Sequence, residues 1–506
     1  MMDLNILLLI LVPLITAFLV PLFDLINIKI RKILVIFSAG FEFFISLTVI
    51  LENYEKITEG NLYLKYYLGG WSPPFGINLV MDNLALIFST LISFSVLLII
   101  IYSIGFIGHH EGKYYVLIFL ILGAMQGTIL TGDMFNLYVF IELITLTSGP
   151  LIAFKRNQDS TEASIKYMFF KIIAGLLFFL GVILLYLNIG SLNMAEISVY
   201  FTELNRNMKI VILSFFLVSI LIKSGIFPFF YWMPKAYSAC PSPISALLSG
   251  VLAKVYIYVF LRLFWNVFDF SILTELGLSY FILYLAIISG LLGHILGLQA
   301  DDIKRMLSFS SVGHIGMIVG VLFLNTTAGL YAGLLHVISH LLMKSSLFVG
   351  TGYLLQFTPS HKINDFGGVA YKNNAIFIGF IITALGMIGV PPLIGFVSKW
   401  YILLAFIEAE VYLGLILVIG GSLTAVVYYF RYISEGYKKM KVDKPDKERH
   451  LLEVFYREQT VTSIIYIFVS LVFISGILFK VLDLPLKAAV QSILDQSSYI
   501  QFILGG

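Results

Sequence analysis

Seven titratable side chains lie within sequence stretches that are otherwise apolar. Glu142 stands in the middle of NLYVFIELITLTSGPLIAF (Asn136 to Phe154), and the others are Lys223, Lys254, His336, His340, Lys344 and Lys399. Each stretch is long enough to cross a membrane as a helix. A charge at the centre of a bilayer costs at least ~3 kcal/mol on insertion scales, so such residues pair with one another or line a polar path. We therefore treat these seven as the candidate functional residues.

The histidines form part of a helical stripe. His336, His340 and Lys344 are spaced four residues apart, so they share one face of a helix. Imidazole accepts and donates protons near neutral pH, which favours a proton relay, although histidines also pack in membrane interiors. A metal site is disfavoured because a lysine one turn away repels cations. His314 is central in another span and could join the relay or simply pack, and His294 is buried by position.

The lysines suggest switches along the same path. Burial disfavours the charged form of a lysine and a nearby carboxylate favours it, so a lysine between the two can load and release a proton when its partner moves. Glu142 could instead form a purely structural ion pair. Lysines near span ends, such as Lys166 and Lys235, can extend to the membrane surface. Lys254 fits that interpretation poorly, with about twelve residues of its span on either side.

Four further residues are weaker candidates. Lys171 lies ten residues into its predicted span, where extension to the surface or a nearby acid could explain it. Asp301, Lys304 and Arg305 lie at the end of a span, and we expect them to be structural or to admit protons.

Composition places the chain in a membrane. Of its 506 residues, 59% are hydrophobic and 12% charged, with a mean hydropathy of +0.96, whereas soluble proteins are about one quarter charged. The pattern predicts an all-α polytopic membrane protein. Cys240 is the single cysteine, which excludes an intrachain disulfide and a multi-cysteine cluster site. No hydrolase nucleophile, phosphate loop, nucleotide fingerprint or haem-ligation pattern occurs. We expect no catalytic residue, metal or cofactor on this chain, membrane lipid as its surroundings and no nucleic-acid partner.

About fourteen spans are predicted, near 3–24, 30–51, 78–105, 113–130, 133–154, 161–189, 208–237, 242–265, 277–298, 303–323, 326–349, 373–406, 409–434 and 460–481. Basic residues concentrate in the odd-numbered loops, so the positive-inside rule predicts that these loops are cytoplasmic and that both termini lie outside a prokaryotic cell membrane. The segment 435–459 is expected to be a cytoplasmic linker. The tail from Pro485 to Leu504 is expected to be a weak interfacial helix.

Spans 7 and 12 are unusually long and carry internal prolines, namely Pro228 and Pro234 in one and Pro391 and Pro392 in the other. Proline removes a backbone donor, so both helices should break, and broken backbone at membrane depth occurs where it is buried or lines a cavity. The breaks lie five spans apart, which predicts two inverted five-helix repeats. The resulting division is 1–112, 113–265 as the first repeat, 266–434 as the second, and 435–506.

Five ordered motifs between about residues 60 and 435 carry a family resemblance: GDMFNLYVFIELITLTS, IKSGIFPFFYWMPKAYSACPSPISALLSGVLAKVYIY, QADDIKRMLSFSSVGHIGMI, HVISHLLMKSSLF and GVPPLIGFVSKW. The chain resembles the antiporter-like subunits of respiratory complex I. That family includes the D-type member of Mrp cation/proton antiporters and subunits of energy-converting membrane-bound hydrogenases. The absence of a long lateral helix favours the shorter, Mrp D-type branch.

The resemblance implies roles for individual residues. It implies that Glu142 and Lys223 are an interacting pair whose separation couples neighbouring subunits. Lys254 resembles the central proton carrier and Lys399 the terminal carrier, a position where some relatives have glutamate. The stripe formed by His336, His340 and Lys344 resembles the link between them.

The expected function is proton translocation, with Na+/H+ antiport as a further option, within a multisubunit complex. We favour the pumping arm of a ferredoxin-driven hydrogenase- or sulfur-reductase-type complex, whose peripheral partner subunits would carry iron–sulfur clusters and a NiFe or similar centre. Membership of a stand-alone Mrp antiporter is the alternative. A single-chain transporter of a small solute and a non-conducting structural subunit are further alternatives.

Overall fold

The computed structural model describes residues 2–104, 106–107, 111–439 and 451–505. Its elements are α1 (Met2–Ile26), α2 (Ile28–Glu52), α3 (Tyr54–Thr58), β1 (Tyr63–Tyr67), β2 (Asn78–Asp82), α4 (Asn83–Ser103), α5 (Glu111–Leu130), α6 (Met134–Ile152), α7 (Gln158–Ile189), α8 (Met194–Tyr200), α9 (Arg206–Ser224), α10 (Trp232–Ala239), α11 (Ser242–Ala246), α12 (Ala253–Leu261), α13 (Phe270–Glu275), α14 (Leu278–Gln299), α15 (Ile303–Leu322), α16 (Thr327–Leu354), α17 (Val369–Lys372), α18 (Asn374–Ile388), α19 (Ile394–Glu408), α20 (Tyr412–Tyr437), α21 (Leu451–Ile477), α22 (Phe479–Leu494) and α23 (Gln496–Leu504). Two π-helical turns, η4 (Leu247–Leu252) and η5 (Arg262–Val267), flank α12, and short 3-10 turns occur at Leu68–Gly70, Ala153–Lys155, Phe201–Glu203, Leu355–Phe357 and Ile363–Asp365.

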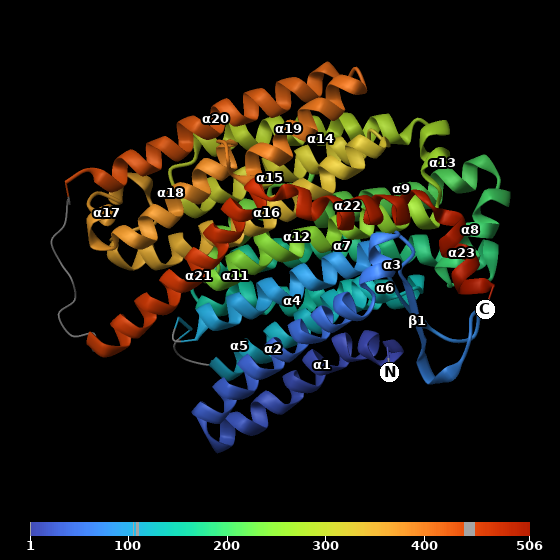
Figure 1. The fold of residues 1–506 in the computed structure, drawn as a ribbon, viewed down its shortest axis with the longest axis horizontal. Helices are drawn as coiled ribbons and strands as arrows, with labels where there is room; N and C mark the ends of the chain where they lie inside the picture. Colours follow the sequence, from blue (N-terminus) through green and yellow to red (C-terminus); the bar gives the residue numbers. More distant parts are fainter. Residues whose placement is uncertain (1, 105, 108–110, 440–450, 506) are drawn as a thin grey trace.

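The helices form one elongated bundle (Figure 1). Thirteen helical stretches in the described part of the chain are long and apolar enough to span a membrane. The predicted span 373–406 is not among them because it consists of two shorter helices, α18 and α19. With this broken span the fourteen predicted spans are accounted for, and the all-α polytopic membrane fold is confirmed. The inverted repeats and the four-part division of the chain stay predictions.

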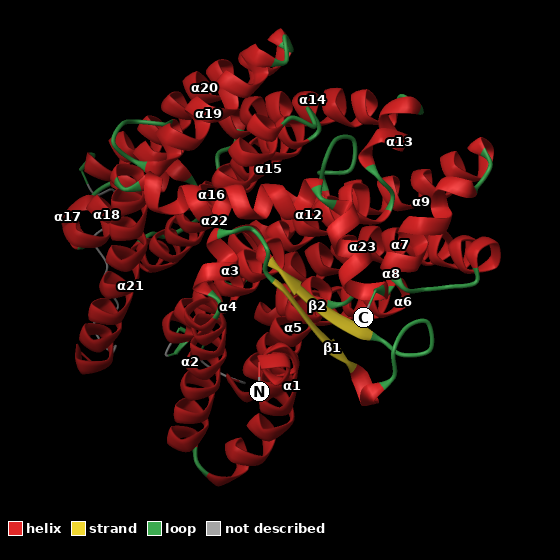
Figure 2. Cartoon of the chain, turned by 45° about the vertical axis from the view of Figure 1, so that its right-hand side comes forward, coloured by secondary structure: helices red, strands yellow, loops and turns green. Residues whose placement is uncertain are grey.

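The predicted start of the third span was wrong. Residues 78–82 are not helical but form β2, which pairs antiparallel with β1 through Tyr63 opposite Asp82 and Tyr67 opposite Asn78. The helix α4 begins at Asn83, where the Asp82 carboxylate accepts a hydrogen bond from the Ala85 backbone N–H at 2.8 Å. The hairpin lies close to α23 and to the C-terminus (Figure 2).

Both proline-containing spans are broken as predicted, but a glycine ends each first half. Gly225 follows α9 with φ of 69°, and Gly389 follows α18 with φ of 98°. In each case the next residue's N–H bonds back to the last turn of the helix, from Ile226 to Leu221 and from Val390 to Leu385, both at 3.0 Å. Such left-handed glycine caps terminate helices because glycine has no Cβ to clash. Pro234 interrupts nothing, since it lies in the first turn of α10.

The loops alternate between two ends of the bundle, as the predicted spans require. At one end, short backbone bridges join the second, fourth and sixth loops, between Leu79 and Thr131 and between Asp133 and Asn193. At the other end, the third, fifth, seventh and eleventh loops and the start of α15, which follows the ninth loop, contribute to the lining of one cavity. Both chain ends lie at the hairpin end (Figure 1). The outward orientation of the termini stays a prediction.

The C-terminal segment differs from its prediction. It contains two helices, α22 and α23, and α22 begins at Phe479 and packs against α4 and α16. The Asn266 side chain donates to the Ser492 carbonyl at 3.0 Å, and the Asn266 carbonyl accepts from Gln496 at 3.0 Å. The tail is therefore docked on the bundle; its position relative to a bilayer surface stays a prediction. Of the predicted linker 435–459, the part 440–450 lies outside the described residues, and α21 already begins at Leu451.

A buried ion pair fastens the hairpin to the bundle. Arg262 Nη2 lies 2.8 Å from Asp82 Oδ2, and both side chains are at most 4% exposed. The guanidinium also donates to Tyr258 Oη at 2.8 Å and lies 5.3 Å from the Tyr499 ring on α23. Three parts of the chain that are distant in sequence therefore meet at this arginine.

Arg262→Met is expected to destabilise the protein by ~3–5 kcal/mol, because it leaves the buried Asp82 carboxylate without a counter-charge. Thermal denaturation of the detergent-solubilised protein measures the effect. The double variant Arg262→Met/Asp82→Asn should recover part of the loss. If the single and double variants are equally unstable, the arginine contributes packing and not charge compensation.

Candidate functional site

The predicted pair of Glu142 and Lys223 is in contact. Glu142 lies on α6 and Lys223 is the penultimate residue of α9, and Lys223 Nζ donates to Glu142 Oε1 at 2.9 Å. The same ammonium lies 3.4 Å from Thr145 Oγ1. The lysine side chain is 1% exposed, whereas that of Glu142 is 20% exposed. The carboxylate is therefore the end of the pair that faces the outside of the bundle.

Lys171 on α7 belongs to the same group. The residue is fully buried, so its side chain does not extend to the membrane surface. Its ammonium donates to the Lys223 carbonyl, while Lys223 Nζ donates to the Lys171 carbonyl at 3.3 Å. The Lys171 ammonium also lies 4.1 Å from the Trp232 ring centroid and 4.2 Å from that of Tyr256. Lys171 thus satisfies a carbonyl at the end of α9, where helix carbonyls lack intrahelical partners, and cation–π contacts support its charge.

Two other lysines, Lys166 and Lys235, reach the outside of the bundle, as expected for lysines near the ends of spans. Lys166 and Lys235 are 55% and 36% exposed at their side chains, and both contact Glu162 at the outside of the bundle.

A close approach between α6 and α7 fixes the Glu142 carboxylate. A Cβ added at Gly175 would lie 2.1 Å from Glu142 Oε1, so this glycine leaves the room in which the carboxylate sits.

Gly175→Ala should displace the carboxylate from Lys223 and reduce coupled proton transport, because a misplacement of ~1 Å in a proton-transfer group can cost up to 10²-fold. Proton uptake by reconstituted vesicles measures it. Gly420→Ala, where an added Cβ meets nothing within 4 Å, is the matched control and should transport normally.

Lys254 lies at the start of α12, directly after the π-helical turn η4. Its ammonium donates to the Ser249 carbonyl at 2.8 Å, and the residue is 1% exposed. A π-turn widens the helix by one residue and frees backbone groups, which explains how a carbonyl within the same helix can serve the lysine. The sequence placed Lys254 inside the membrane correctly but gave no sign of the π-turn.

Two serines connect Lys254 with Lys344. Ser249 Oγ lies 2.7 Å from Ser311 Oγ, and Ser311 Oγ donates to the Leu307 carbonyl at 3.0 Å. That carbonyl also accepts from Lys344 Nζ at 2.8 Å. Hydroxyl groups donate and accept, so the pair forms a polar bridge between the two ammonium groups.

Four buried imidazole rings lie together on α14, α15 and α16, the last of which also carries Lys344. They belong to His294, His314, His336 and His340. The ring of His314 on α15 lies 5.1, 5.2 and 5.2 Å from those of His336, His340 and His294. His314 Nδ1 and His336 Nε2 are 2.9 Å apart, and His336 Nδ1 lies 2.9 Å from Ser398 Oγ. Each hydrogen-bonded imidazole can accept a proton on one nitrogen and donate from the other, which is the requirement for a relay. Among the residues that the structure describes, no group of three or more His, Cys, Asp and Glu side chains is arranged to hold a metal.

Lys399 follows Ser398 on α19 and reaches back across the helix break. Its ammonium donates to the carbonyls of Met387 and Ile388 at 2.7 and 3.1 Å and to Ser422 Oγ on α20 at 2.9 Å. These carbonyls belong to the last two residues of α18, which have no intrahelical partners. A lysine therefore caps the broken end of α18, as Lys171 caps that of α9.

The buried groups from Glu142 to Lys399 form a row through the protein. This row does not include Asp301, Lys304 or Arg305. Asp301 is exposed and pairs with Arg431 at 2.7 Å, and the Arg305 backbone N–H is capped by Asp302 at 2.8 Å. Lys304 is buried and donates to the Cys240 carbonyl at 2.6 Å. Lys304 and Arg305 lie in the first turn of α15 and Asp301 lies just before it, so their contacts are those of structural residues.

The sequence analysis missed two polar groups. Glu42 on α2 is fully buried and accepts from Gln126 at 2.9 Å and from Ser93 at 3.2 Å, and an acid within an apolar span, the signal that identified Glu142, would have found it. The second missed group is Tyr428, whose hydroxyl lies 3.2 Å from His294 Nδ1 and donates to Ser310 at 3.1 Å. A tyrosine in an apolar span is too common to signal such a contact.

The buried row coincides with the region that matches known proteins. Residues 131–424 match the family described as NADH:quinone oxidoreductase/Mrp antiporter, transmembrane region. The chain belongs to this family. It is 35% identical over 417 residues to the N-type membrane component of NADH-quinone oxidoreductase from Desulforudis audaxviator, covering 80% of this chain and 82% of that one. It is 29% identical over 443 residues to the D-type component of the Na(+)/H(+) antiporter from Bacillus subtilis, covering 86% and 87%.

Solved structures of membrane complexes contain chains with the same fold. A chain of the membrane-bound sulfane sulfur reductase, an archaeal respiratory membrane complex, superposes with a TM-score of 0.89 at 27% identity over 99% of both chains. A chain of the Mrp complex from Dietzia superposes with a TM-score of 0.87 at 20% identity, over 100% of this chain and 99% of that one. This multi-pass membrane protein is therefore an antiporter-like subunit related to members of multisubunit membrane complexes.

Proposed function

We propose that this chain carries protons through its interior as a membrane subunit of a multisubunit ion-translocating complex. The observation that carries the proposal is the buried series of Glu142, Lys223, Lys254, Lys344, the histidines and Lys399, several of which are joined by hydrogen bonds, ring contacts or short serine bridges. Groups of this kind, desolvated and close together, exchange protons when their spacing changes.

The two ends of the series are suited to coupling with neighbouring subunits. Glu142 opens onto a side of the bundle where α6 and α7 expose large apolar residues, among them Val139, Leu146 and Leu176. At the other end, Lys399 and Ser422 lie on α19 and α20, which expose Trp400 and Leu423. Apolar faces of this kind contact lipid or other membrane subunits. A neighbour that displaces Glu142 would release Lys223 and start proton transfer along the series.

We further propose that the complex is driven by a redox reaction. The similarity to a chain of the sulfane sulfur reductase supports this choice, and peripheral partners would then hold iron–sulfur clusters and a NiFe or similar centre. The similarity to a component of the Na(+)/H(+) antiporter supports the alternative, a free Mrp-type antiporter. The titratable side chains of the row are lysines, histidines and one glutamate, which suit protons. We therefore assign any sodium site to another subunit.

Purification from native membranes in mild detergent, followed by mass spectrometry of the copurifying subunits, tests this assignment. Iron–sulfur and NiFe-type partners would support redox drive. Small hydrophobic Mrp-type partners alone would support the antiporter. Recovery of the chain by itself, with solute uptake after reconstitution, would overturn the proposal in favour of a single-chain transporter.

A further inference from the structure

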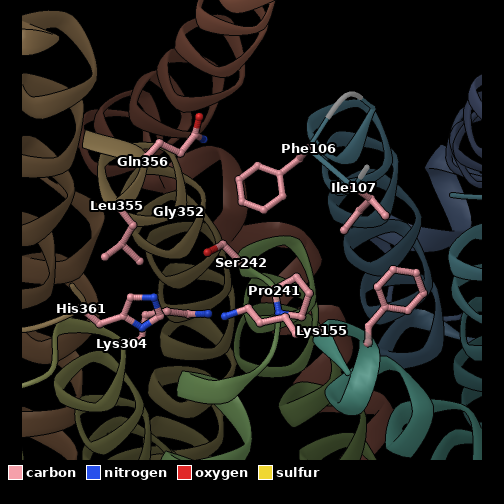
Figure 3. A pocket seen from close by; sticks show the side chains of 11 residues that line it. Phe106, Ile107, Lys155, Pro241, Ser242, Lys304, Gly352, Leu355, Gln356 and His361 are labelled. Atoms are coloured by element: carbon pink, nitrogen blue, oxygen red, sulfur yellow. The ribbon is translucent and has the colours of Figure 1, made fainter. Parts of the chain in front are cut away.

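A cavity of about 370 Å³ lies at the end of the bundle opposite the hairpin. Figure 3 shows the side chains that line it. Five loops or helix ends contribute to its wall, and its lining includes the basic residues Lys155, Lys304 and His361. Phe154, Leu355 and Ile107 supply apolar surface beside them. The cavity lies apart from the proton-carrying series, none of whose members lines it.

The charges that face this cavity are predominantly positive. Figure 3 shows the ammonium ends of Lys155 and Lys304 directed toward each other next to Pro241 and Ser242. Neither lysine forms an ion pair among the described residues, and Lys304 has only the Cys240 carbonyl as a hydrogen-bond acceptor there. No described lining residue is acidic. Beside the cavity, Asp302 caps Arg305 and lies 3.6 Å from His361 Nδ1.

Two ammonium groups that face one another across a cavity repel, and an anion between them removes this cost. A phosphate group is suited to the space because its oxygens accept hydrogen bonds from lysines and from the Ser242 hydroxyl. We propose that this cavity binds a phosphate group, supplied by the headgroup of an anionic phospholipid.

The position in the membrane favours a lipid over free phosphate. The cavity lies at the ends of membrane-spanning helices, on the side whose loops carry the excess of basic residues. Basic pockets between helices at the cytoplasmic side of membrane proteins bind anionic headgroups, and the apolar wall formed by Phe154 and Leu355 suits a glycerol backbone and acyl chains.

Binding there would act on the elements that hold the proton path. Lys304 joins the start of α15, which carries His314, to the Cys240 carbonyl at the end of α10, the second half of the broken span. Ser242 begins the helical segment that leads to Lys254. A bound phosphate would therefore fix, at one end, the spacing between α10 and the two segments that carry His314 and Lys254.

Thermal denaturation of the detergent-solubilised complex, titrated with short-chain phosphatidylglycerol, tests the proposal. Phosphatidylglycerol should raise the midpoint of the wild type and phosphatidylcholine should not. Lys155→Gln should weaken the apparent affinity about fivefold, and Lys155→Gln/Lys304→Gln about 25-fold, since each lysine near a membrane surface contributes about that factor. Lys372→Gln, an exposed lysine on the same side but outside the cavity, is the matched control and should bind as the wild type does.

Inorganic phosphate separates the two sources. If phosphatidylglycerol stabilises and phosphate at equal concentration does not, the ligand is a lipid headgroup. If inorganic phosphate alone gives the same lysine-dependent shift, the cavity is a phosphate site whose ligand comes from solution and not from a lipid. Equal shifts with both lipids, or an unchanged affinity in Lys155→Gln, would overturn the proposal. Lys155 is exposed, so that variant decides the question even if Lys304→Gln does not fold. The readout is binding, so it does not depend on the proposed transport function.

Discussion

Glu142→Gln is expected to leave the complex assembled and to reduce coupled proton transport by at least about tenfold. The amide keeps the size of the side chain and one oxygen for hydrogen bonding, but Lys223 loses the carboxylate that lies 2.9 Å from its ammonium. A buried ammonium without its counter-charge is disfavoured by ~3–5 kcal/mol, so the lysine can no longer alternate between a paired and a released state. Proton uptake into vesicles, driven by the natural reaction of the complex, measures the loss.

The matched control is Glu162→Gln. Glu162 also contacts two lysines, but at the exposed outside of α7, where ion pairs contribute little. This variant should assemble and transport normally. Normal coupling in Glu142→Gln, with the subunits still copurifying, would show that the pair with Lys223 is a structural clamp and not a switch.

The fold was predictable wherever a local signal sufficed. Apolar length located the spans, and the long proline-containing stretches revealed two broken helices. The stopping points were not predicted, because Gly225 and Gly389 end the helices through left-handed caps before the prolines are reached. The strand β2 was included in the third span because its apolar residues, Leu79 to Met81, are separated by only two residues from the apolar run that begins at Leu84.

The site, like the fold, was predictable only where the sequence carries a local signal. A charge within an apolar run is a local signal, and it identified the residues of the row. What each residue contacts depends on distant parts of the chain. Lys171 could be interpreted as a surface lysine until α9 placed the Lys223 carbonyl beside it. The bridge between Lys254 and Lys344 uses two serines that have no charge and hence no signal of their own.

Lys254→Met is expected to reduce proton transport on the order of 10²-fold or more while the complex still assembles. Methionine approximates the length of lysine and is favourable in a membrane interior, so packing around α12 should persist, whereas no titratable group of the row would remain between Lys223 and Lys344. The Ser249 carbonyl loses its donor, yet the hydroxyl contact from Ser249 to Ser311 remains. Transport by reconstituted vesicles gives the loss, and copurification of the subunits shows assembly.

Lys166→Met is the appropriate comparison, because Lys166 is a lysine of a spanning helix that reaches the outside and pairs there with Glu162. It should transport at the wild-type rate. Ser311→Ala should fall between the two variants, since it removes the hydroxyl that bridges toward Lys344 but leaves both ammonium groups in place. If Lys254→Met transports as well as Lys166→Met, protons do not pass along this row, and the buried lysines serve only to satisfy the carbonyls of the broken and π-turned helices.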